Sequence, residues 1–178
     1  MAQFDVTQAL DPAYLADLEK LPLEELRAKR SACAGLETEL SYLRRLVQAR
    51  IDLVLDESER RRRGAGTGRD DLIERLPRIL GEHDRTEGPG RLPTVLAPAE
   101  VDQLRLAARV EELLPSEQLG SLPTLSAGKL GELLDTLSLL ERNVSAERRS
   151  LHDIIDRLQE ELVRRYRCGE ATVDTLLP

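Results

Sequence analysis

Two stretches of the chain carry apolar residues at steps of three and four. The first set is Leu36, Leu40, Leu43, Val47, Ile51 and Val54, and the second is Leu130, Leu133, Leu137, Leu140, Val144, Leu151, Ile154 or Ile155, and Leu158. This spacing places the side chains on one face of an α-helix, in the heptad pattern of a coiled coil. The pattern therefore predicts two long helices, each with a leucine-rich seam.

The limits of these helices follow from proline, glycine and capping residues. Pro22 favours a start at about residue 22, and the Arg60–Arg63 cluster before Gly64 favours an end at about residue 63. Ser126 is a suitable N-cap for a second helix that ends at about residue 167. The predicted helices are therefore about 22–63 and about 126–167.

The remaining segments predict shorter elements. Asp11 and Pro12 favour a short helix that reaches about Lys20. The connector, about 64–125, contains glycine- and proline-rich sequence and two predicted helices, Asp70–Leu80 and Pro98–Leu114. We expect a single helical domain over residues 1–178. Its fold class is all-α, an antiparallel coiled-coil hairpin with shorter helices in the connector. Self-association through the same seams is the competing arrangement.

Beside each seam runs a row of polar residues that occurs twice with identical spacing. The rows are Glu37, Ser41, Arg44, Gln48 and Asp52, and then Glu141, Ser145, Arg148, His152 and Asp156. The offset is 104 residues (141 − 37), and seven residues are identical between Leu36–Asp52 and its copy. Outside this window the match is weak. Each polar residue follows a seam position by one, a rotation of about 100°, so the row flanks the seam.

Two interpretations of this row remain open. Polar residues that flank a coiled-coil seam commonly form interhelical ion pairs or contact water, without any ligand. A second copy that keeps Ser and Arg, while neighbouring residues differ, favours two half-sites for one ligand or a symmetric ligand pair. Arginine can donate to guanine O6 and N7 or neutralise phosphate, and a carboxylate can accept from guanine N–H groups. The chemistry therefore favours a guanine nucleotide.

Composition narrows the class of protein. Aromatic residues make up only 2% and charged residues 33%, which is typical of long helices, and the net charge of −7 argues against a general DNA-binding protein. We expect no membrane span and no signal peptide. Cys33 and Cys168 stand apart from other metal-ligating residues, which favours reduced thiols in a cytoplasmic protein. Without a metal-ligand cluster, a nucleophile–base pair or a phosphate loop, we expect no enzyme.

The repeated motif Glu-x3-Ser-x2-Arg-x3-Gln-x3-Asp on two long helices resembles that of the RsiG family of Streptomyces anti-sigma factors. This resemblance implies that the two motifs bind a dimer of cyclic di-GMP. It also implies a heterodimer with a sporulation sigma factor of the WhiG type, which is thereby kept from transcription. The binding set carried over is the ten motif residues named above.

Two features qualify the resemblance. His152 stands where the family pattern has glutamine, although a histidine can still donate a hydrogen bond. The chain also has almost no aromatic residue placed to stack on a base, because Tyr42 follows Ser41 and is turned away from the row. The guanines would therefore stack on each other or on arginine, which fits a ligand dimer.

Overall fold

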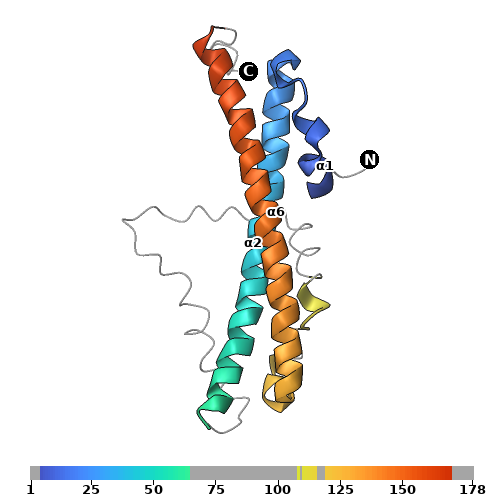
Figure 1. The fold of residues 1–178 in the computed structure, drawn as a ribbon, viewed down its shortest axis with the longest axis vertical. Coiled ribbons are helices and arrows are strands. Elements are labelled where there is room, and N and C mark those ends of the chain that lie inside the picture. Colours follow the sequence, from blue (N-terminus) through green and yellow to red (C-terminus); the bar gives the residue numbers. More distant parts are fainter. Residues whose placement is uncertain (1–4, 65–107, 109, 116–118, 170–178) are drawn as a thin grey trace, which may run out of the picture. The chain divides into compact units, whose positions relative to one another are not determined.

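The computed structural model describes residues 5–64, 108, 110–115 and 119–169. These residues form helices and turns, and none of them lies in a β-strand. The elements are α1 (Val6–Leu10), two 3₁₀ turns η1 (Pro12–Leu15) and η2 (Leu18–Lys20), α2 (Leu23–Arg62), a 3₁₀ turn η4 (Leu122–Thr124) and α6 (Ala127–Arg167) (Figure 1). The predicted all-α class is confirmed, and both long helices have the predicted limits to within one residue.

The chain forms two compact units, and each long helix contributes to both. Described residues of 1–40 and 145–178 make the first unit, and described residues of 41–144 make the second. In the first unit the start of α2 lies beside the end of α6, and in the second unit the end of α2 lies beside the start of α6 (Figure 1). Within each unit the two helical segments are antiparallel, as the predicted hairpin requires. That residues 1–178 form a single domain stays a prediction.

The leucine seams form the core of both units. Buried seam residues are Leu36, Leu40, Leu43, Val47, Val54, Leu130, Leu137, Val144, Leu151, Ile154 and Leu158. Of the two candidates at one position, Ile154 is buried and Ile155 is half-buried. Removing such side chains from water stabilises a fold by about 25 cal/mol for each Å² of apolar surface. The seam of the second helix is interrupted at Glu147, which is half-buried. In the repeat this position corresponds to Leu43, 104 residues earlier, which is fully buried.

Local capping explains where the long helices begin and end. The backbone N–H of Lys129 donates to Ser126 Oγ at 3.2 Å, which makes Ser126 the N-terminal cap of α6. Gly64, with a φ of 72°, follows the end of α2 in the left-handed conformation that glycine adopts without strain. Both predicted boundary signals therefore act as expected.

The predicted helix from Asp11 to about Lys20 is wrong. Asp11 does cap the following turn, with Ala13 N–H donating to its Oδ1 at 2.8 Å. The turn ends at Leu15, and Asp17, with a φ of 53°, separates η1 from η2. The segment is therefore two 3₁₀ turns. The predicted helix Asp70–Leu80 lies outside the described residues, as does most of Pro98–Leu114.

A guanidinium clamp fastens η2 to the end of α6. Arg165 donates to the carbonyl oxygens of Leu18 and Leu21, each at 2.6 Å, and its Nε donates to Glu161 at 2.8 Å. The Leu18 carbonyl also accepts from the Leu21 N–H at 3.2 Å, so the guanidinium gives this oxygen a second donor. The clamp holds the first unit together at the start of α2.

The second unit contains the same clamp. Arg61 donates to the carbonyl oxygens of Leu125 and Leu122 at 2.6 and 2.8 Å, and its Nε donates to Glu57 at 2.6 Å. All four residues stand 104 positions from their counterparts in the first clamp (165 − 61, for example). The internal repeat therefore extends beyond Asp52, although the sequence match there is weak.

The two clamp carboxylates, Glu161 and Glu57, have pKa values that make the stability of the fold vary with pH in the acid range. Hydrogen bonds from Arg164 lower the pKa of Glu161 to about 2, against the opposing effect of burial, and Arg165 adds to the lowering. Burial raises the pKa of Glu57, but hydrogen bonds from Arg60 and Arg61 outweigh it, so that the net shift is also downward.

We expect the free energy of unfolding to fall as pH falls below the ordinary glutamate value of 4.5 towards 2. A carboxylate with a lowered pKa in the folded state stabilises that state while ionised, and this contribution disappears on protonation. Urea unfolding at about pH 6 and at about pH 3 measures the effect. A Glu161→Gln variant should show a weaker pH dependence, and an unchanged dependence would contradict the assignment.

Candidate ligand-binding site

The ten motif residues divide between the two units as two sets of five. Half-site A, in the first unit, consists of Glu37, Ser145, Arg148, His152 and Asp156. Half-site B, in the second unit, consists of Glu141, Ser41, Arg44, Gln48 and Asp52. Each half-site thus takes the glutamate of one motif and the other four residues of the other motif. The two sets match position by position, except that His152 in A corresponds to Gln48 in B.

In half-site A, two residues of α6 contact the glutamate of α2. Arg148 Nη1 lies 3.4 Å from Glu37 Oε1, and His152 Nε2 lies 3.3 Å from the same oxygen. Arg148 and His152 are one helical turn apart on α6, so both can reach a single residue of α2. The first residue of one motif therefore contacts the third and fourth residues of the other.

Half-site B repeats this contact with the helices exchanged. Arg44 Nε on α2 lies 3.2 Å from Glu141 Oε1 on α6. Again the first residue of one motif pairs with the third residue of the other. The antiparallel arrangement of each unit brings the motif arginine and the motif glutamate together in the same way, and sequence alone could not give this pairing.

The burial of these residues suits a ligand site at the surface. Glu37, Arg44, Glu141 and Arg148 are half-buried. Ion pairs that water can reach contribute only about 0–1 kcal/mol to stability. Both the guanidinium and the carboxylate groups can therefore exchange their mutual contacts for contacts with a bound molecule at little cost.

The chemistry of this donor and acceptor set fits a guanine nucleotide. Arginine offers a planar fork of N–H donors, which matches guanine O6 and N7 or two phosphate oxygens. A glutamate beside it offers acceptors for the N–H groups on the other edge of guanine. Each half-site supplies one such arginine and one such glutamate.

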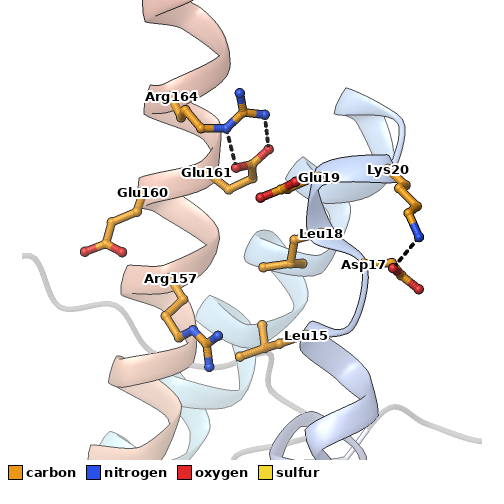
Figure 2. Close-up of a pocket in the computed structure, with 9 residues that line it drawn as sticks. All are labelled: Leu15, Asp17, Leu18, Glu19, Lys20, Arg157, Glu160, Glu161 and Arg164. Atoms are coloured by element: carbon orange, nitrogen blue, oxygen red, sulfur yellow. Dashed lines mark hydrogen bonds and ion pairs between the residues drawn. The ribbon is translucent and has the colours of Figure 1, made fainter.

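A separate groove lies near the clamp of the first unit. It has a volume of about 610 Å³, and Figure 2 shows α6 on one side and the η1–η2 segment on the other. Its lining residues are Leu15, Asp17, Leu18, Glu19, Lys20, Arg157, Glu160, Glu161 and Arg164. None of the ten motif residues lines it. The groove is therefore distinct from the predicted site, and its mixed acidic and basic lining indicates no single ligand chemistry.

Sequence reasoning missed the clamp residues that hold the long helices in place. Their signal was present, because Glu57, Arg60 and Arg61 recur as Glu161, Arg164 and Arg165 at the offset of the polar motif. The carbonyl acceptors in η2 and η4 cannot be recognised in a sequence, since any residue has a carbonyl. The repeat thus includes both the polar motif residues and the clamp residues that hold the long helices in place.

Comparison with known families matches the chain to a family model described as RsiG-like. The match covers residues 12–80 and 116–178, which is most of the chain and includes both motifs. The chain belongs to the RsiG-like family. A comparison with curated proteins finds no match.

Membership of the RsiG-like family gives this protein a broad role. The family indicates an anti-sigma factor, whose role is regulatory rather than catalytic, and it implies a sigma factor as partner. Among the described residues, no helix has the length and apolar character needed to cross a membrane. The motif residues are thus placed in a family whose members act by binding.

Proposed function

We propose that this RsiG-like protein binds a dimer of cyclic di-GMP through half-sites A and B and, in that state, holds a sporulation sigma factor of the WhiG type. The sigma factor is then kept from RNA polymerase, which blocks transcription from its promoters. The observation that carries the proposal is the repeated cross-helix pairing, Arg148 with Glu37 and Arg44 with Glu141. Two sets that match except at His152 and Gln48 suit a ligand that is itself symmetric.

The motif residues have distinct roles in this proposal. Arg44 and Arg148 contact the guanine edge that carries O6 and N7, and Glu37 and Glu141 accept from the N–H groups of the other edge. The remaining residues supply hydrogen bonds to sugar or phosphate oxygens or to exocyclic groups, and they are Ser41, Gln48, Asp52, Ser145, His152 and Asp156. His152 can donate like the glutamine of the family pattern, and it already contacts Glu37 at 3.3 Å.

A ligand dimer explains how guanine could bind without aromatic side chains. The chain has three tyrosines, one phenylalanine and no tryptophan. Tyr14 and Tyr166 make other contacts: the Lys29 ammonium group lies over the Tyr14 ring, and Arg27 donates to the Tyr166 hydroxyl. Guanines of two nucleotides can instead stack on each other, with arginine planes at the ends of the stack. The protein then needs to supply only polar contacts around the stack.

The partner interaction rests on the family and on charge. The chain has a net charge of −7, and sigma factors present basic surfaces to DNA. Complementary charge favours association with such a surface and competes with DNA for it. A pull-down of the chain from its host should recover a WhiG-type sigma factor in greater yield when cyclic di-GMP is added. Equal recovery with and without the nucleotide would contradict ligand control.

A second candidate function is a structural coiled-coil adaptor that takes no ligand. The same ion pairs favour it, because Arg44–Glu141 and Arg148–Glu37 already satisfy part of the polar row within the protein. In that case the row is only a solvated flank of the seam.

A thermal-shift panel with nucleotides separates the two functions. A ligand at 100 times its dissociation constant stabilises the folded state by about 2.7 kcal/mol, which raises the melting temperature by several degrees. We expect such a shift with cyclic di-GMP, and a much smaller one with cyclic di-AMP because adenine lacks O6. An adaptor should show no shift with any nucleotide, and that result would overturn the proposed ligand.

A further inference from the structure

Within the window Leu36–Asp52, the repeat preserves one charged residue that the five-residue motif does not include. Arg45 and Arg149 directly follow the motif arginines, and they are identical at the offset of 104. Both are exposed. Among the described residues, neither guanidinium makes a hydrogen bond or an ion pair, whereas Arg44 and Arg148 are paired with glutamates. Two unpaired arginines are thus repeated beside two paired ones.

The charge of the half-sites gives these arginines a role. Half-site A contains Glu37, Arg148 and Asp156, with His152 neutral, so its formal charge is −1. Half-site B contains Glu141, Arg44 and Asp52, so its formal charge is also −1. A dianionic nucleotide placed against either set alone meets net repulsion. Including Arg149 in A and Arg45 in B brings each formal charge to zero.

Helix geometry places both arginines at the edge of the polar row. Arg45 comes four residues after Ser41 and three before Gln48, and side chains at these spacings are neighbours on a helix surface. The same relations connect Arg149 with Ser145 and His152. Since Leu43, two residues before Arg45, is fully buried in the seam, Arg45 lies on the solvent side of the row.

We propose that Arg45 and Arg149 bind the phosphates of the nucleotide, while Arg44 and Arg148 read its guanines. This inference rests on the proposed function, because it assigns the phosphate contacts of the same ligand. An exposed arginine without an intramolecular partner is suited to a phosphate, which needs charge more than a fixed geometry. A motif arginine already oriented by a glutamate is suited to the more exacting edge of a base.

Titration calorimetry with cyclic di-GMP on four forms of the full chain tests the assignment. The forms are the unaltered chain, Arg45→Gln with Arg149→Gln, Arg45→Lys with Arg149→Lys, and a control, Arg62→Gln with Arg167→Gln. The control removes the same charge from the same helices at exposed positions. These positions are about 15 Å along the helix from the motif residues, beyond the screening length of about 8 Å at 0.15 M salt. Circular dichroism checks that each form is folded.

We expect the glutamine pair to bind at least about tenfold more weakly at 0.15 M salt and with a smaller salt dependence. The lysine pair should stay within about threefold of the unaltered chain, because an ammonium group also binds phosphate. The control should bind as the unaltered chain does. If the glutamine pair binds the nucleotide as tightly as the control does, the phosphate assignment is overturned. A weaker sigma-factor complex in the glutamine pair would not rescue it. Failure of the unaltered chain to bind overturns the proposed function instead.

Discussion

Replacing Arg44 or Arg148 with alanine is expected to abolish binding of cyclic di-GMP, which means a loss of at least about 100-fold in affinity. Each substitution removes a charged, planar donor that guanine can engage at two points, and it removes the arginine that faces the motif glutamate. Titration calorimetry measures the loss. Because these arginines lie in half-exposed ion pairs, stability should change by no more than about 1 kcal/mol.

Two further variants test whether binding needs the donor geometry of Arg44, and not only its positive charge, and whether it needs an arginine at this position. Arg44→Lys keeps the charge but loses the fork of donors, so we expect binding nearly as weak as that of the alanine variant. Arg62→Ala removes an exposed arginine 18 residues further along α2 (62 − 44) and should leave binding unchanged. Normal nucleotide binding by either alanine variant, Arg44→Ala or Arg148→Ala, would show that the motif is not the binding site.

The largest loss of stability is expected from Glu57→Gln. Glu57 is fully buried, and its carboxylate accepts from Arg60 Nε and Nη2 at 2.8 and 2.7 Å and from Arg61 Nε at 2.6 Å. The variant removes the negative charge that faces the Arg60 guanidinium, whose side chain is only 5% exposed. Breaking one side of a buried ion pair costs about 3–5 kcal/mol. Urea unfolding at neutral pH measures this cost.

The internal repeat supplies a matched control for this prediction. Glu161 makes the same contacts with Arg164 and Arg165. Each carboxylate faces one buried arginine, Arg60 at 5% and Arg165 at 8% exposed, but the second arginine is more exposed at Glu161 (Arg164, 42%) than at Glu57 (Arg61, 23%). The Glu161 side chain is itself 10% exposed, against 1% for Glu57. Glu161→Gln should therefore cost clearly less than Glu57→Gln. Equal losses, or the reverse order, would mean that burial of the arginine does not determine the cost.

The long helices could be predicted from the sequence because several local signals agree. The leucine spacing defines the seam, Pro22 and Ser126 favour the helix starts, and Gly64 follows the first end. The structure places α2 and α6 within one residue of these limits. The segment Asp11–Lys20 could not be predicted, because its form depends on Arg165, which supplies donors to Leu18 and Leu21 from far along the chain.

The candidate site was predictable as a set of residues but not as a set of contacts. Spacing places Glu37 and Arg44 on one stripe of a helix, yet their partners are Arg148 and Glu141 on the other helix. Which residues meet depends on how the two helices are aligned, and packing of the whole seam determines that alignment. The additional contact of His152 with Glu37 has the same origin.

Native mass spectrometry of the chain with saturating cyclic di-GMP tests the central claim most directly. If half-sites A and B bind a ligand dimer, the bound species carries two nucleotides for each chain, and it disappears when Arg44 and Arg148 are both replaced with alanine. A chain that keeps its unbound mass at saturation, or one that retains the nucleotides after both replacements, would contradict the account.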